Sequence, residues 1–202
     1  MPTMHPKENP RTTRVRDAVT DVVIRLLVEE GAGAITASRV AEEAKVARST
    51  IYQHWSSTNE LLLHAIDRLI SPHGETPITG DLESDLVSAL TLMRERMVKR
   101  PFRQVFSTLL DQANYYEEFE AAQVRFVTGS LAQIRAPLEA AIRRGELPST
   151  LDVDMAILQL AGPLFVQHIM LRTTISNELI ARTSARFLEE HRLCRGQVDS
   201  TE

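Results

Sequence analysis

Apolar side chains recur at helical spacing along almost the whole chain. The clearest stripe consists of Val15, Val19, Val22, Val23, Leu26 and Leu27. This spacing places the apolar groups on one face of a helix with a period of about 3.6 residues. We expect this helix to end at Gly31, because glycine readily adopts the left-handed conformation that terminates helices.

Shorter helices are predicted after this first one. Thr36 is expected to cap a helix, and a second short helix follows at residues 48–54 after a break at residues 45–47. Residues 57–60, Ser-Thr-Asn-Glu, have the spacing of a capping box and predict the start of a longer helix that continues to Leu69.

The rest of the chain alternates between turn formers and long amphipathic segments. Residues 71–80 are rich in turn formers and predict a boundary or a long loop. Helices are then predicted at 81–99, from Pro101 through Leu110, at 117–144, at 152–172 and at 177–192. Pro137 is expected to kink or divide the helix that contains it. No alternating strand pattern is visible, so the predicted fold class is all-α.

The composition is that of an ordinary globular protein, with 202 residues, 43% hydrophobic and 25% charged. No run of about 20 apolar residues predicts a membrane span, and no secretory signal is expected. A single cysteine, Cys194, cannot form an internal disulfide, so a cytoplasmic protein is expected. The sequence has no nucleophile–base pair, phosphate loop or metal-ligand spacing, so we expect no enzyme, no metal and no cofactor.

The net charge of -4 is divided unevenly along the chain. Residues 1–70 contain 9 basic and 9 acidic side chains, and the remainder contains 14 and 18. Before Asp17 the chain has four basic residues against Glu8, namely Lys7, Arg11, Arg14 and Arg16. The total argues against a protein that coats nucleic acid, but a neutral N-terminal part with a basic arm is compatible with a local DNA-reading surface.

Residues 35–63 contain two short helices joined by a tight break, the arrangement of a helix-turn-helix. In this motif the second helix lies in the major groove, with its N-terminal residues at the base edges. That helix has a dense polar face: Arg48, Ser49, Thr50, Tyr52, Gln53 and His54. Arginine can donate two hydrogen bonds to guanine, glutamine can pair with adenine, and hydroxyls can bind phosphate. Ile51 and Trp55 are expected to face the helical core.

The segment resembles the DNA-binding domain of TetR-type (tetracycline-repressor-like) transcriptional regulators over residues 12–70. The resemblance rests on Val40, Ala41 and Ala44, followed by Thr50-Ile51-Tyr52-Gln53-His54-Trp55. It implies that Thr36, Thr50, Tyr52 and His54 contact DNA, mostly at phosphates. It also implies that Arg48, Ser49 and Gln53 set the base preference. Residues 138–192 resemble one common C-terminal type of this family.

Three positions depart from the pattern of that family. Lys45 stands where glycine is usual, so the turn is expected to hold a left-handed lysine or to take a different form, and Lys45 could contact a phosphate. Ala47 replaces the usual Ser or Thr cap, which forfeits about 1 kcal/mol. Thr58 stands where a lysine often anchors the next helix to DNA, which leaves only the helix N-terminus to bind an anion there.

The resemblance further implies that the C-terminal helices enclose a small-molecule pocket and form a dimer. Candidate pocket residues, each of which could instead simply pack the core, are Met93, Met97, Phe106, Tyr115, Phe126, Phe165 and His168. The helix at 152–172 is apolar over more than one face. Together with the helix at 177–192 it is therefore predicted to form the surface of a two-fold homodimer.

The sequence thus predicts a helix-turn-helix DNA-binding domain with a basic arm at residues 1–70. An effector-binding and dimerisation domain is predicted at residues 71–202. The predicted function is a sequence-specific repressor that is released from a palindromic DNA operator by a largely apolar small molecule. The alternatives are an activator, a regulator without a ligand, or a small helical enzyme or carrier in which the N-terminal motif is only structural.

Overall fold

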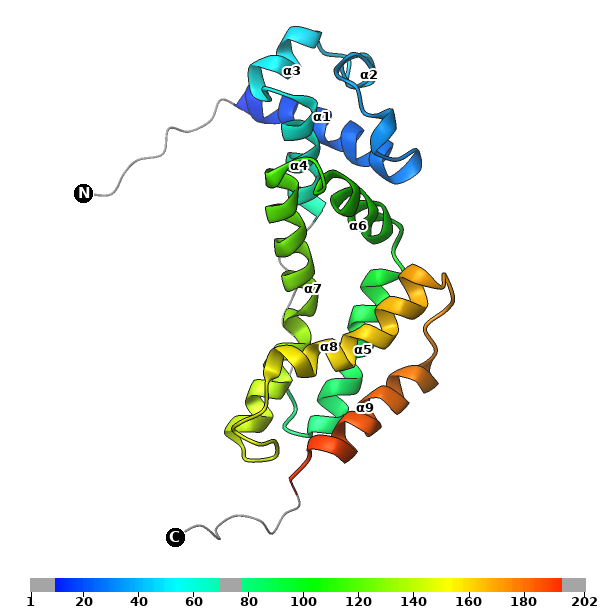
Figure 1. Ribbon diagram of the computed structural model, residues 1–202. Coiled ribbons are helices and arrows are strands. Elements are labelled where there is room, and N and C mark those ends of the chain that lie inside the picture. Colours follow the sequence, from blue (N-terminus) through cyan, green and yellow to red (C-terminus); the bar gives the residue numbers. More distant parts are fainter. Residues whose placement is uncertain (1–9, 70–77, 194–202) are drawn as a thin grey trace, which may run out of the picture. The chain divides into compact units, whose positions relative to one another are not determined.

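The computed structural model describes residues 10–69 and 78–193, which form helices and turns and contain no strand (Figure 1). Its elements are α1 (Pro10–Glu29), η1 (Ala32–Ala34), α2 (Ala37–Glu43), α3 (Arg48–His54), α4 (Thr58–Leu69), α5 (Leu82–Met97), α6 (Arg100–Gln112), α7 (Glu117–Arg143), α8 (Val153–Phe165), η2 (Val166–Met170) and α9 (Asn177–His191). The all-α prediction is confirmed. Lys7 of the predicted basic arm, most of the predicted 71–80 loop and Cys194 lie outside the described residues.

The described helices group into two compact units. The first contains α1 to α4 together with residues 104–123, and the second contains the described residues of 72–103 and 124–202. Helices α6 and α7 therefore contribute to both units.

In the first unit, α1 packs against α2 and α4, and α2 packs against α3. The predicted apolar stripe of α1 forms much of this core, because Val19, Val23 and Leu26 are fully buried. Ile51 and Trp55 are each only 2% exposed, which confirms that they face inward. The polar face of α3 is thereby turned outward.

The ends of the first helices follow the local sequence. Gly31 has a φ of 90°, and its N–H donates to the carbonyl of Leu26 at 3.0 Å, which closes α1 as predicted. The side chain of Thr36 accepts a hydrogen bond from the backbone N–H of Arg39 at 3.2 Å and so caps α2.

The turn between α2 and α3 contains both departures anticipated there. Lys45 has a φ of 55°, so it adopts the left-handed conformation that glycine tolerates better. Ala47 occupies the N-cap position of α3 and makes no side-chain cap bond. Helix α3 therefore begins without a side-chain cap and depends on the burial of its inner face.

The predicted capping box of α4 forms in a shifted version. Ser57 accepts from the backbone N–H of Glu60 at 3.1 Å, as expected. The carboxylate of Glu60 accepts from the backbone N–H of Ser56 at 2.6 Å, one residue before the cap. The pKa of Glu60 is lowered by these hydrogen bonds from Ser56.

In the second unit, α5, α8 and α9 lie side by side (Figure 1). The in-phase apolar residues of α5 are buried in the core of this unit, which confirms that pattern: Leu82, Leu86, Leu90, Met93 and Met97. Asp81 caps α5 by accepting from the N–H of Ser84, and Asp152 caps α8.

The two prolines within helices have different surroundings. Helix α7 continues through Pro137, so this residue does not divide it. Helix α8 contains Pro163 and changes after Phe165 into the π-helical turn η2, in which the N–H of Leu171 donates to the carbonyl of Val166 at 3.0 Å. The predicted helix at 152–172 is therefore present over Val153–Met170, but its last turn is π-helical. Pro163 removes one regular backbone bond just before the π turn.

The segment Val153–Met170 is long and apolar enough to cross a membrane by length and composition alone, with 33% of its residues buried. The sequence predicts no membrane span, because it contains no run of about 20 apolar residues. A helix with protein on more than one side meets the same criteria, because it needs apolar residues all round.

The N-cap positions of α2 and α3 can be tested by two opposite substitutions. We expect Ala47→Ser to raise the free energy of unfolding by about 1 kcal/mol, because serine would accept a bond from the first turn of α3. Thr36→Ala should lower it by about the same amount. Chemical denaturation of both variants and the unaltered protein measures the difference. Two changes of the same sign would contradict the assignment of these caps.

Candidate nucleic-acid interface

The outer face of α3 gathers most of the predicted recognition residues. Arg48, Ser49, Tyr52 and Gln53 are exposed, whereas Thr50 and His54 are half-buried at its flanks. A helix of 7 residues cannot place side chains reliably by itself, so the buried Ile51 beneath them sets the direction of this face.

Arg48 and Tyr52 form a pair on this face. They lie one helical turn apart, and Nη2 of Arg48 donates to the Tyr52 hydroxyl at 3.3 Å. The guanidinium carbon lies 5.6 Å from the centre of the Tyr52 ring, within the range of a cation–π contact. This contact restricts the guanidinium while leaving both residues exposed.

The surroundings of α3 carry no opposing charge from the local sequence. Between Glu43 and Glu60 the chain has no acidic residue. Lys45 is exposed in the turn before α3, and Thr36 is exposed at the start of α2. The stretch that contains α3 is therefore positive and rich in hydrogen-bond donors, as a surface that meets phosphates requires.

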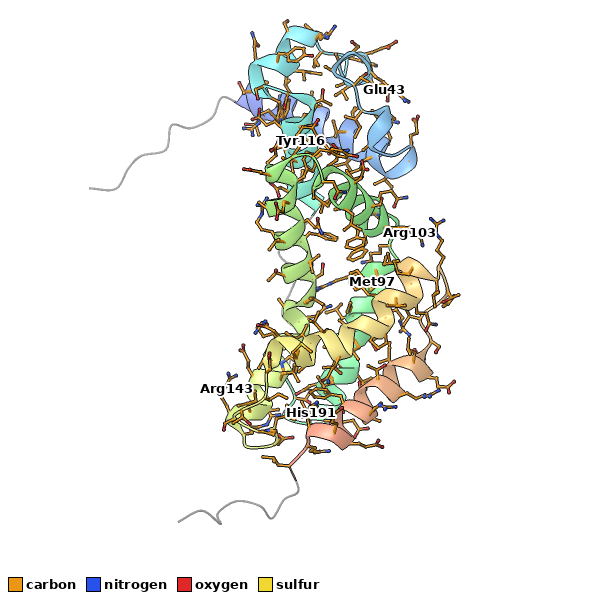
Figure 2. All side chains as sticks on the ribbon, in the orientation of Figure 1. Glu43, Met97, Arg103, Tyr116, Arg143 and His191 are labelled. Atoms are coloured by element: carbon orange, nitrogen blue, oxygen red, sulfur yellow. The ribbon has the colours of Figure 1, made fainter. Side chains whose placement is uncertain are left out.

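Glu43 of α2 and Glu29 and Glu30 at the end of α1 belong to an ion-pair network (Glu43 is labelled in Figure 2). The Arg39 guanidinium contacts both carboxylate oxygens of Glu30, at 2.6 and 2.9 Å, and Nε of Arg39 lies 2.9 Å from Glu43. Arg25 also pairs with Glu43 and lies 3.6 Å from Glu29. The network joins α1 to α2, the helix against which α3 packs.

These pairings shift the protonation equilibria in the expected directions. The hydrogen bond from Arg39 lowers the pKa of Glu30, and the bonds from Arg25 and then Arg39 lower the pKa of Glu43. Arg39 itself has a raised pKa because of Glu30 and Glu43. Both glutamates therefore remain ionised and paired at neutral pH.

Five of the predicted pocket residues lie in the second unit. Met93 and Met97 of α5 are buried in its core, with Met97 labelled in Figure 2. Phe126 of α7 is buried, and Phe165 of α8 packs against the core. His168 is 7% exposed, and its Nε2 lies 3.1 Å from the carbonyl oxygen of Met97. This bond joins the π turn to the end of α5.

The other two predicted pocket residues belong to the first unit. Phe106 lies on α6 and is half-buried. Tyr115 lies in the turn before α7 and is 74% exposed. These two residues therefore belong to a different unit from Met93, Met97 and His168.

Two further features concern possible ligands. A groove of about 450 Å³ runs between α8 and α9 and is lined by Gln159, Pro163, Leu179, Arg182, Thr183, Arg186, Phe187 and Glu190. Among the described residues, no group of three or more His, Cys, Asp or Glu side chains is placed to hold a metal ion.

Comparisons with known proteins identify the family. Residues 19–65 match the family model "Bacterial regulatory proteins, tetR family", and residues 76–187 match "Tetracyclin repressor-like, C-terminal domain". The chain belongs to the TetR family of transcriptional regulators. The first match covers α2, α3 and most of α1 and α4, so the exposed face of α3 belongs to the helix-turn-helix of a DNA-binding regulator.

Individual relatives agree with this family. An uncharacterized HTH-type transcriptional regulator, YdeS of Bacillus subtilis, is 26% identical over 172 residues, which cover 85% of this chain and 86% of the relative. The DNA-binding transcriptional repressor TetR of Mycobacteroides abscessus is 27% identical over 153 residues, which cover 75% and 79%. The crystal structure of a TetR transcriptional regulator from Agrobacterium tumefaciens superposes with a TM-score of 0.76 at 20% identity, over 89% of this chain and 95% of that one. The relatives are transcriptional regulators and are not enzymes.

Sequence reasoning missed the ion pairs around α2 and the pair on α3. Arg39–Glu43 and Arg48–Tyr52 are one turn apart, so the spacing of i and i+4 could have revealed them. Arg39–Glu30 and Arg25–Glu43 join different helices and have no local signal.

The network predicts a pH-dependent contribution of Arg39 to stability. A glutamate with a lowered pKa stabilises the folded state above its ordinary pKa, and this contribution is lost as the pH falls through the lowered value. Arg39→Gln should therefore lower the melting temperature most near neutral pH, and the difference from the unaltered protein should shrink below about pH 4. The same comparison for Arg14→Gln, an exposed arginine of α1, serves as the control. A difference that does not change with pH would contradict this role.

Proposed function

We propose that the protein is a cytoplasmic homodimeric repressor that binds a palindromic operator through α3 and leaves it when a small molecule binds the second unit. The observation that carries this proposal is the exposed, acid-free face of α3, fixed from beneath by Ile51 and Trp55. The name of the M. abscessus relative, a DNA-binding transcriptional repressor, supports repression as the direction of control.

On this proposal, the residues of α3 divide the work of recognition. Arg48 and Gln53 read bases in the major groove, since their side chains are exposed and suit guanine and adenine. Ser49, Thr50 and His54 lie beside them and bind phosphates or single acceptors. Thr36 and Lys45 flank this surface from the start of α2 and from the turn and add phosphate contacts. Tyr52 holds the Arg48 guanidinium in place and also reaches the DNA backbone.

Dimerisation through α8, η2 and α9 is supported by the outer face of α8. Met155, Leu158 and Val166 are exposed at helical spacing, and Leu158 is 56% exposed. Gly162 lies between them in the sequence and would allow another helix to approach closely. An apolar stripe of this length on a regulator fits a second copy of the chain, and two-fold symmetry then supplies the second half-site.

Release by an effector requires that the effector bind two conformations of the protein with different affinity. The second unit offers residues for such a site. Met93 and Met97 of α5 lie in its core, Phe165 of α8 packs against that core, and His168 of η2 bonds to the carbonyl of Met97. Phe126 of α7 is buried and packs against Phe102. The π turn at His168 is a departure from regular helix of a kind that is often found at functional sites.

Substitutions in α3 test its role as the recognition helix. Arg48→Ala should weaken operator binding by about 1–3 kcal/mol and relax the preference at one base pair, whereas Tyr52→Ala should weaken binding as well. Operators selected from random DNA, followed by binding titrations with the purified variants, measure both effects. Affinity should also fall steeply as salt increases, because phosphate contacts release counterions.

As matched controls, the same two substitutions are made at an arginine and a tyrosine that lie outside α3. Arg103→Ala and Tyr115→Ala remove an exposed arginine and an exposed tyrosine outside α3, and both should bind the operator as the unaltered protein does. Unchanged affinity in both Arg48→Ala and Tyr52→Ala would refute the assignment of α3 as the recognition helix.

A substitution on the exposed face of α8 tests the proposed dimer interface. Leu158→Glu places a charge on the exposed apolar face of α8 and should shift the protein from dimer to monomer, with a loss of operator affinity. Val124→Glu provides the control, because Val124 of α7 is 61% exposed and lies outside α8, η2 and α9. Sedimentation measures the oligomeric state. A Leu158→Glu variant that remains dimeric would exclude this face as the interface.

A further inference from the structure

Arg96 of α5 is a partly buried arginine without an acidic partner among the described residues. Its Nη1 donates to the side-chain oxygen of Gln133 on α7 at 2.6 Å. Burial lowers the pKa of its guanidinium, and no neighbouring carboxylate raises it. Arginine nevertheless stays protonated in proteins, so this partly buried site carries a positive charge.

Three other arginines of the same unit have acidic partners. Arg135 pairs with Asp154, Arg144 lies 2.6 Å from Glu146, and Arg182 lies 3.9 Å from Glu178. Those arginines have carboxylates within reach, whereas Arg96 has only a neutral amide. Arg96 therefore differs from these three arginines, because no carboxylate of the described chain pairs with it.

The Gln133 side chain is held in an orientation that suits Arg96. Gln133 is 7% exposed, and its amide nitrogen donates to the carbonyl of Ser130 at 3.1 Å. Its oxygen is thereby left for Arg96. Ser130 is itself buried, and its hydroxyl donates to the carbonyl of Phe126 at 2.7 Å. One face of α7 therefore fixes the arginine by one of its donors and leaves the others without a partner in the described residues.

Contacts within the same unit link the helices of this arginine and Gln133 to α6 and α8. Arg96 joins α5 to α7, and the rings of Phe102 and Phe126, 5.0 Å apart, join α6 to α7. Phe102 and Phe165, 6.2 Å apart, join α6 to α8, and His168 returns to α5 at Met97. Met97 follows Arg96 in the sequence, and Met93 lies about one turn earlier; both are buried. The three phenylalanine rings belong to helices that these contacts join to one another.

We propose that Arg96 binds the acidic group of the effector, and that this effector is an organic anion with one carboxylate-like group and an apolar body. The apolar body would lie against Met93, Met97 and the phenylalanines, which suit a hydrocarbon chain or an aromatic ring. The carboxylate would accept charge-assisted hydrogen bonds from the guanidinium donors that Gln133 leaves unused. This inference rests on the proposed function, since it specifies the ligand of the second unit.

The experiment compares matched pairs of probes that differ only in charge. Straight-chain and aryl carboxylates of graded size are titrated against the purified full-length protein together with their primary amides, and dissociation constants are measured by calorimetry. We expect the best carboxylate to bind at least about tenfold more tightly than its amide, the effect of one charge-assisted contact. Arg96→Met should abolish this ratio, and Arg96→Lys should retain part of it. Arg94→Met, which removes an arginine from the same helix where it contacts Asn177, should leave the ratio unchanged.

Several outcomes would overturn the proposal. These are no binding of any carboxylate at millimolar concentration, equal binding of acids and amides, or an unchanged ratio in Arg96→Met. A merely structural Arg96 would give the last result together with a lower melting temperature. Operator binding without any probe is measured in parallel and should persist in Arg96→Met. If the unaltered protein does not bind an operator, the proposed function is refuted. If it binds the operator but does not prefer carboxylates to their amides, only the anionic effector is refuted.

Discussion

The burial of Ile51 and Trp55 is the constraint on which the DNA-reading surface depends. Helix α3 has 7 residues and no side-chain cap, so its own backbone bonds cannot hold it. Two inner side chains, each 2% exposed, fix its rotation against the rest of the first unit. Once they are buried, helical geometry alone turns Arg48, Ser49 and Gln53 outward. The recognition chemistry is thus set by packing on the opposite side of the same helix.

Three arginines of the chain have different kinds of partner. Arg39 forms ion pairs with Glu30 and Glu43 and so joins α1 to α2. Arg48 is restricted by a neutral ring, so its charge remains available at the surface. Arg96 is restricted by a neutral amide inside the second unit. A net charge of -4 for the whole chain conceals these three situations.

Helix α8 has apolar side chains on both its buried and its exposed faces. Its composition predicts contacts on more than one face, and the structure accounts for one of them through Ile157, Leu160 and Leu164 in the core. The exposed stripe on the other face is what a partner would cover, and it also explains why the segment passes a length-and-composition test for a membrane span. The pattern did not predict the π turn after Phe165, because that turn depends on backbone bonds rather than on hydrophobicity.

The sequence by itself determined the features encoded within about one helical turn. These include the helix ends at Gly31 and Thr36 and the inward face of α3. At Lys45 the sequence left two forms of the turn open, and the structure shows the left-handed one. Only the tertiary structure decided which distant residues meet. Arg96 and Gln133 are 37 residues apart and His168 and Met97 are 71 apart, so no local spacing signals either contact. Periodicity and capping depend on backbone hydrogen bonds between near neighbours, whereas such pairings exist only after the helices have packed.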